Sequence, residues 1–268
     1  MGIDYSIALA CEPKKALGSE GIMMRIKGQE RAETIIRMFR ESGDTRPVSE
    51  IGFELVRNTA QGEETQIVYV QELLDEVADL DPYRSACIAC PANMRGQDFG
   101  CMGFISYPIS GEAEAWLLNR LPQPAQAPLI WLLLKQGVDN FHYSGETIKE
   151  WRQQAGVFFE DPVAATRRLG EFRLSADQLF EMIFGVGHSI SANHAGILLL
   201  LLHVIPNNIE ADQIQNISPP PPDADQLHPF LLDEAPYTGN NQSIIEFQNF
   251  LKALYIAWRL DVPVLIDA

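Results

Sequence analysis

The order of strand and helix signals over residues 1–110 restricts the possible folds of this chain more than any other feature. Alternating apolar residues predict a strand over Asp4–Ala10, and apolar residues at helical spacing predict a helix over Gln29–Glu41. The strands Ile51–Val56 and Gln66–Val70 follow. The polar, glycine-containing link between these two strands is typical of a hairpin.

A second helix and a last strand complete this pattern. The helix begins at Gln71 and Pro82 breaks it, because proline has no amide proton to donate and clashes with the preceding turn. Gly103–Tyr107 supplies the strand. The order β-α-β-β-α-β is that of ferredoxin-like domains. Residues 21–27 fit either a strand or a backward extension of the first helix. We therefore expect an α+β protein whose residues 1–121 form a ferredoxin-like sheet domain.

Strand signals nearly vanish after Gly111, so a mostly α-helical domain is expected over residues 122–268. The proline cluster Pro122–Pro128 is the predicted joint between the two domains. An acidic, proline-rich connection spans about residues 206–240, and Pro219–Pro222 within it favours an extended polyproline II loop. Helices are expected at Gly111–Leu121 with Ser110 as its cap, Leu129–Gln136, Gly145–Gln154, Ala176–Phe184, Ala192–Val204 and Ser243–Arg259.

The four cysteines of the chain indicate a metal site. Cys87 and Cys90 form a C-x2-C pair, which places two thiolates on one tight turn, and Cys101 follows after a loop that contains glycines. Cys11 stands at the end of the first predicted strand. In the expected sheet the last strand is antiparallel to the first and begins where the first one ends, so all four thiols meet at one edge. The sequence therefore predicts a four-cysteine metal site.

Zn²⁺ is the first choice of metal, because four thiolates make a closed, redox-silent structural zinc site. A 4Fe-4S cluster is the second choice, because it also takes four thiolates and has apolar neighbours such as Ile88 and Phe99. Four inert core thiols and a redox pair at Cys87 and Cys90 are the alternatives. The site would be flanked by the cations Lys14, Lys15, Arg84 and Arg95.

A second polar cluster surrounds His188 and His194. Ser189 and Ser191 lie beside these histidines, but the G-x-S-x-G pattern of many serine hydrolases does not occur. We interpret the cluster as a junction between helices, in which the small polar residues act as caps. The alternative is an enzyme pocket near His188 and His194. No residue is assigned a catalytic role.

The net charge of −16 argues against nucleic-acid binding, because the field of such a protein repels phosphate backbones. No Lys or Arg occurs between Arg173 and Lys252, and the acids of that stretch are read as a solvated face or as a docking surface for a basic partner. No basic leader and no membrane-length apolar run is seen. A cytoplasmic protein without a membrane partner is expected.

The predicted function is that of a metal-stabilised protein that binds another protein as an adaptor, regulator or assembly factor. This expectation rests on the closed four-cysteine site and on the missing catalytic motifs. The alternatives are an iron–sulfur enzyme or electron-transfer protein, and an enzyme with a purely structural zinc. Nothing in the sequence indicates the oligomeric state.

Overall fold

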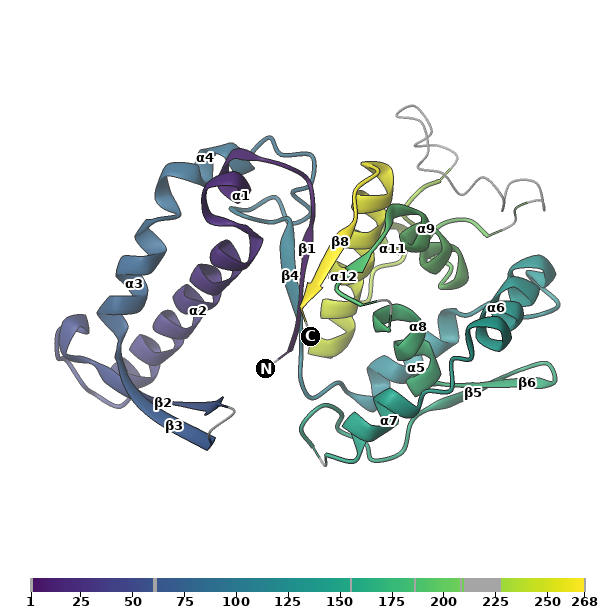
Figure 1. Ribbon diagram of the computed structural model, residues 1–268, viewed down its shortest axis with the longest axis horizontal. Helices are drawn as coiled ribbons and strands as arrows, with labels where there is room; N and C mark the ends of the chain where they lie inside the picture. Colours follow the sequence, from purple (N-terminus) through teal and green to yellow (C-terminus); the bar gives the residue numbers. More distant parts are fainter. Residues whose placement is uncertain are drawn as a thin grey trace. The chain divides into compact units, whose positions relative to one another are not determined.

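The computed structural model describes residues 2–59, 62–154, 156–185, 187–207, 209 and 228–267, with only the backbone described at 55–59 and 62–64. The chain forms two compact units (Figure 1). The first comprises Met1–Leu9, Pro91–Gly96 and Gly100–Ala268, and the second comprises Ala10–Cys90 and Gln97–Phe99. The boundary expected between residues 121 and 122 falls inside the first unit. Mixed α+β structure is confirmed.

The first unit contains a four-stranded sheet in the order β4-β1-β8-β7. β1 (Gly2–Ile7) lies between β4 (Met102–Ser106) and β8 (Val264–Asp267) and runs antiparallel to both. β7 (Ser189–Ile190) pairs with the other side of β8. Figure 1 shows the yellow strand β8 beside the purple strand β1. Strands from the two ends of the described chain are therefore neighbours in one sheet.

The helix α12 (Gln242–Arg259) packs against β1 and β4 of this sheet and against α9 (Ala192–Leu201). Phe250 of α12 is fully buried and meets the ring of Tyr5 edge-on, with 5.1 Å between the ring centroids. Glu246 accepts hydrogen bonds from the backbone N–H and the hydroxyl of Ser106, at 2.6 and 3.0 Å. These contacts fix α12 on the sheet through one aromatic pair and one buried carboxylate.

The helices predicted for the second half of the chain are confirmed within a few residues at their ends. Ser110, Ser175, Ser191 and Asn241 each cap a helix by accepting a backbone N–H, as helix N-caps do. The remaining helices of this part are α5 (Gly111–Arg120), α6 (Pro128–Phe141), α7 (Glu146–Arg152), α8 (Ala176–Phe184) and α11 (Leu231–Glu234). Among the described helices, none combines the length and the apolar character needed to cross a membrane.

The described chain after Gly111 is mostly α-helical, as expected, but it also contains short strands that the sequence did not indicate. β5 (Thr166–Leu169) and β6 (Phe172–Ser175) form a hairpin, and β7 and β8 belong to the sheet. These strands have two to four residues each, which is too short for an alternating pattern to be recognised. Pro219–Pro222 and most of the acidic connection lie outside the described residues.

The second unit is a helical pair with a hairpin. α2 (Ser19–Glu41) includes residues 21–27, which are therefore helical, and it packs against α3 (Val70–Ala78). β2 (Gly52–Thr59) and β3 (Gly62–Tyr69) form the expected antiparallel hairpin. The short segments are α1 (Glu12–Leu17), η1 (Val48–Glu50), η2 (Asp81–Tyr83) and α4 (Arg84–Cys87). The core of the unit consists of Ala32, Ile51 and Val70, with Ile35, Ile36, Phe39, Val48, Phe53, Leu73 and Leu74 around them.

A ferredoxin-like N-terminal domain is not confirmed. β1 and β4 pair antiparallel as predicted, but β2 and β3 form a separate two-stranded sheet. The other side of β1 is occupied by β8, from the C-terminal end of the described chain. Phe53 of the hairpin packs instead into the cluster formed with α2 and α3. Two strand pairings were predicted correctly, but their assembly into one sheet was not, and neither was the place of β8.

The position of β8 in the sheet can be tested with two neighbouring residues. Ile266 is 5% exposed and Leu265 is 38% exposed, as expected for successive residues of a strand. We expect Ile266→Asp to lower the free energy of unfolding by about 3 kcal/mol or more, because it buries a carboxylate and loses apolar contact. Leu265→Asp should cost less than about 1 kcal/mol. Urea unfolding of both variants measures the difference, and equal losses would contradict this placement of the strand.

Candidate functional site

Three of the four predicted metal ligands, Cys11, Cys87 and Cys90, belong to the second unit. Cys11 immediately precedes α1 and has an extended backbone, with φ −148° and ψ 167°. Cys87 is the last residue of α4, and Cys90 closes the next turn by donating its backbone N–H to the carbonyl of Cys87 at 3.3 Å. The three thiols therefore come from the beginning of one short helix and from the end of another.

The environment of Cys87 includes the two other thiols of the second unit. Burial raises the pKa of the Cys87 thiol, the backbone N–H of Phe99 opposes this by donating to the sulfur, and the charges of Cys90 and Cys11 raise the pKa further. Such an influence requires that the thiols lie within electrostatic range. Cys11, from a distant part of the sequence, is therefore within electrostatic range of the C-x2-C turn.

This arrangement is not a coordination sphere. Among the described residues, no group of three or more His, Cys, Asp or Glu side chains is arranged to hold a metal ion. Cys101 belongs to the first unit, where its carbonyl accepts a hydrogen bond from the N–H of Ile7 at 3.0 Å. The structure therefore brings three of the predicted ligands into one unit, and the role of Cys101 stays a prediction.

The two flanking arginines have other contacts in the structure. Arg84 donates to the carboxylates of Asp81 and Asp98, at 2.7 and 3.1 Å, so its charge is largely balanced by these two groups. Arg95 belongs to the first unit, where Arg95 and the hydroxyl of Tyr5 occupy the space that a side chain at Gly103 would need. The charge of Arg84 is therefore already balanced by Asp81 and Asp98. The role of Arg95 beside the thiols stays a prediction.

The cluster around His188 and His194 is built as a junction between elements. The carbonyl of His188 accepts the N–H of Ile266 at 2.8 Å, and Ser191 caps α9 by accepting the N–H of His194 at 3.3 Å. Burial lowers the pKa of His194, although its hydrogen bond to the backbone of Met182 opposes the shift. These contacts hold β7 and the start of α9 in place, which agrees with the interpretation as caps and packing groups.

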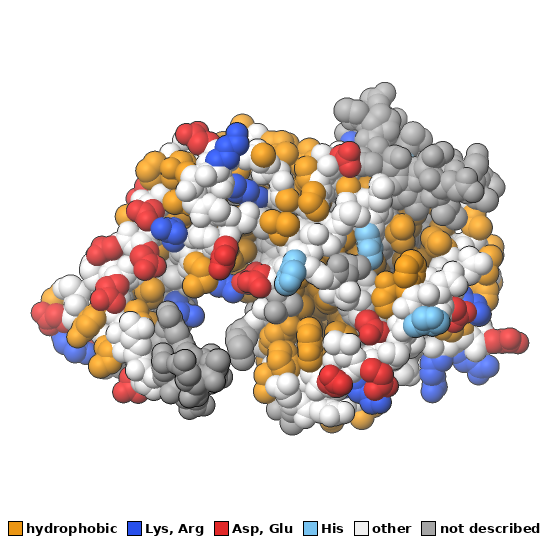
Figure 2. All heavy atoms as spheres, in the orientation of Figure 1, with side chains coloured by type: hydrophobic (Ala, Val, Ile, Leu, Met, Phe, Trp, Pro, Cys, Tyr) orange, Lys and Arg blue, Asp and Glu red, His pale blue; other side chains and the backbone are white. Residues whose placement is uncertain are grey.

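The acids of the stretch between Arg173 and Lys252 differ in their surroundings where the structure describes them. Asp177 and Glu246 are buried and hydrogen-bonded, and Glu181 accepts the N–H of Gly145 at 2.6 Å. The side chain of Asp233 is exposed, and Glu210, Asp212, Asp223 and Asp225 lie outside the described residues. Figure 2 shows acidic side chains at several places on the face that it draws. The docking surface for a basic partner stays a prediction.

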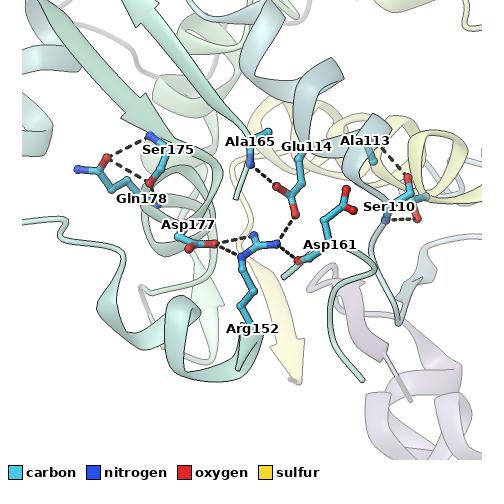
Figure 3. Close-up of polar contacts among 10 residues, drawn as sticks. Ser110, Ala113, Glu114, Arg152, Asp161, Ala165, Ser175, Asp177 and Gln178 are labelled. Atoms are coloured by element: carbon cyan, nitrogen blue, oxygen red, sulfur yellow. Dashed lines mark hydrogen bonds and ion pairs between the residues drawn. The ribbon is translucent and has the colours of Figure 1, made fainter. Parts of the chain in front are cut away.

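A buried charge cluster that the sequence did not indicate lies in the first unit (Figure 3). Arg152 of α7 donates from Nη1 to Glu114 of α5 at 2.8 Å, and from Nε and Nη2 to Asp177 of α8 at 2.9 and 2.6 Å. Its Nη1 also donates to the carbonyl of Asp161 at 2.9 Å. The guanidinium lies over the ring of Phe159, 4.0 Å from the ring centroid. One side chain thus joins three helices and a loop.

The cluster is closed to solvent. Glu114 is 0% exposed, and its second oxygen accepts the N–H of Ala165 at 2.9 Å. Burial raises the pKa of Glu114, and the hydrogen bonds from Ala165 and Arg152 oppose this shift. Burial alone would lower the pKa of Arg152, but its hydrogen bonds to Asp177 and Glu114 raise it. A group so enclosed cannot meet a substrate, and we interpret it as structural.

A cavity of about 240 Å³ is lined by Arg120 and Arg167. Arg120 donates to the carbonyls of Leu202 and His203 at the end of α9, at 3.0 and 3.2 Å. Arg167 donates to two carbonyls at the end of α5. The last carbonyls of a helix have no partner within the helix, so these two arginines satisfy helix ends.

Comparisons with protein-family models, with curated proteins and with solved structures found no match to this chain. Its function must therefore be inferred from its own residues.

The structural role of Arg152 can be tested by Arg152→Met. The change keeps the length of the side chain but leaves two buried carboxylates without their cation, and we expect it to lower the free energy of unfolding by about 3–5 kcal/mol. Lys149→Met, on the exposed side of the same helix, should cost less than about 1 kcal/mol. Urea unfolding of both variants gives the comparison.

The pH dependence of Arg152→Met gives a second measurement. Burial already raises the pKa of Glu114, and removing the guanidinium raises it further. The folded state then binds a proton more tightly than the unfolded state, so the variant gains stability as the pH falls below 7. The stability gap between the parent and the variant should therefore narrow on acidification. If the difference in free energy of unfolding between the parent and the variant grows on acidification, the substitution does not leave the two carboxylates without a partner.

Proposed function

We propose that this chain is a thiolate metal protein in which Cys11, Cys87 and Cys90 bind a Zn²⁺ ion and so stabilise the second unit. The fourth ligand proposed from the sequence is Cys101. The metal would tie the start of α1 to the turn after α4, segments that are far apart in the sequence. The role of such a site is structural, because a closed thiolate site leaves no open position for a substrate.

The observation that supports this proposal is the proximity of Cys11 to the C-x2-C turn. Three thiols that meet by chance in a core have no reason to include a C-x2-C pair on a tight turn. When ionised, the three sulfurs repel one another, and a divalent cation between them would turn this repulsion into attraction. Metal binding would require small movements of the three side chains, since they are not in coordinating positions without the ion.

We further propose that the metal-stabilised unit binds another protein, as an adaptor, regulator or assembly factor. Ile88, between the two cysteines of the C-x2-C pair, is a large apolar side chain that is 80% exposed. An exposed apolar group next to a structural metal is a suitable contact for a partner, because the metal holds it in one position. The net charge of −16 favours a basic partner.

Metal analysis of protein purified without added metal tests the site. We expect about one zinc per chain, and we expect Cys11→Ser and Cys90→Ser to lose the metal and to melt at a lower temperature. Ile88→Ser, which alters the same turn without removing a thiol, should keep the metal. Cys101→Ser distinguishes a site with four cysteines, which would lose zinc, from one with three.

A chain that contains neither zinc nor iron, or a Cys11→Ser variant that keeps its metal and melts like the parent, would overturn the proposal. The 4Fe-4S cluster is the second candidate, because it would use the same thiolates. A brown protein with broad absorption near 400 nm and iron in place of zinc would identify the cluster.

A further inference from the structure

A second cavity of the first unit, about 370 Å³ in volume, has a lining of a different kind. Four aromatic side chains line it: Phe141, Tyr143, Trp151 and Phe184. Glu181 is the one carboxylate among the described residues that line it, and the basic side chain among them is His142, with no Lys or Arg. The volume is within the range of about 300–1,000 Å³ that is usual for small-molecule pockets.

The walls of this cavity are held by contacts behind them. The ring of Trp151 leans on Phe158, with 5.7 Å between the ring centroids, and the ring of Phe184 stacks on Phe180 at 6.2 Å. The rings of Phe141 and Tyr143 lie 5.9 Å apart. The support of Trp151 and Phe184 restricts these two rings before any ligand arrives, which lowers the entropy cost of binding.

Glu181 is also fixed in position. One of its oxygens accepts the N–H of Gly145 at 2.6 Å, and the carbonyl of Tyr143 accepts a hydrogen bond from Gln178 of the same helix at 2.9 Å. Gly145 has φ 77°, and a Cβ there would lie 2.9 Å from the backbone nitrogen of Gln178, so the close approach requires glycine. The second oxygen of Glu181 accepts no hydrogen bond within the part of the chain that the structure describes. Its charge is close enough to contribute, after burial, to the raised pKa of Tyr143.

We propose that this cavity binds a small organic cation that carries an alkylated ammonium group, such as a quaternary amine. Aromatic faces attract cations through the negative potential of their rings, and this attraction grows when the cation is desolvated. A quaternary ammonium donates no hydrogen bond, so rings are better partners for it than polar groups. Glu181 supplies the counter-charge. This inference concerns the first unit and does not depend on the metal site proposed for the second.

The competing explanation is a pocket that accepts any apolar molecule of suitable size. Phe141 supports a functional role, because it is 72% exposed although it is large and apolar, and it lies at the rim of the cavity. An apolar pocket has no need of a carboxylate, whereas a cation site needs one. The two explanations predict different responses to ligand charge at constant shape.

Choline and dimethylbutanol, its neutral analogue in which carbon replaces the nitrogen, give this comparison. Binding to the full-length protein can be followed by calorimetry and by the change in tryptophan fluorescence, with Trp151→Leu showing the share that comes from Trp151. We expect choline to bind at least about tenfold more tightly than the neutral alcohol, because the shape is the same and only the charge differs. Equal affinities, or no saturable binding of choline at millimolar concentration, would overturn the proposal.

Two variants identify the groups responsible. Glu181→Gln keeps an oxygen for the N–H of Gly145 but removes the charge, and it should abolish most of the preference for choline over the alcohol. Trp151→Leu should weaken choline binding at least about fivefold, because it removes one π face. Trp116→Leu changes a half-buried tryptophan of α5 that does not line the cavity, and it should leave both affinities unchanged.

The thermal melting temperature of each variant shows whether it is folded. If a folded Glu181→Gln protein keeps the full preference for choline, the carboxylate has no role and the proposal is wrong. A trimethyllysine peptide that binds at least tenfold more tightly than choline would overturn the assignment to a small molecule and would assign the cavity to a modified protein tail. The metal content of the protein is measured separately, so the two proposals can fail independently.

Discussion

The guanidinium of Arg152 holds together three helices of the first unit. It joins α5, α7 and α8 through two carboxylates, and it reaches the loop at Asp161 through a carbonyl. A buried cation of this kind is tolerated only when nearly all of its donors are used, because its desolvation costs several kcal/mol. This cost restricts the packing of the helices, because α5 and α8 must both bring a carboxylate to the guanidinium of α7. Trp151 precedes Arg152 on α7, and Glu181 lies one turn after Asp177 on α8, so the same ion pairs also set the walls of the aromatic cavity.

The helices could be predicted from the sequence because their signals are local. Ser110, Ser175 and Asn241 accept N–H groups of the turn that follows them, and each stands directly before an apolar repeat. The sheet could not be predicted, because its pairing depends on contacts between distant segments. β8 has only four residues and follows Pro263, and nothing in those residues indicates that Val264 and Ile266 complete a sheet begun at Gly2. The ferredoxin-like interpretation placed the hairpin strands β2 and β3 in the same sheet as β1 and β4. The pairings of β1 with β4 and of β2 with β3 are present, but the hairpin forms a sheet of its own and β8 occupies the other side of β1.

The candidate sites, like the secondary-structure elements, differ in how far the sequence could predict them. The prediction that Cys11, Cys87, Cys90 and Cys101 form one site used the antiparallel pairing of β1 and β4. This pairing is present, but it belongs to the first unit, whereas Cys11, Cys87 and Cys90 belong to the second. The four-cysteine site therefore stays a prediction. Neither the Arg152 cluster nor the aromatic cavity has a comparable signal. Glu114, Arg152 and Asp177 are ordinary charged residues on three separate helices, and only the packing of those helices makes them a buried group.

The contacts of Asp177 and Glu246 show how carboxylates of the stretch between Arg173 and Lys252 are held although this stretch contains no Lys or Arg. A carboxylate that is held by backbone N–H groups or by a distant arginine has no need of a lysine nearby in the sequence. Asp177 uses Arg152, and Glu246 uses the N–H and the hydroxyl of Ser106. Glu181 differs from Asp177 because no cation of the described chain forms an ion pair with it. It differs from Glu246 because a described donor reaches only one of its oxygens. A half-buried carboxylate that is fixed by the backbone, surrounded by aromatic rings and left without a described cation has a charge that a ligand can neutralise. This combination distinguishes the aromatic cavity from a simple packing defect.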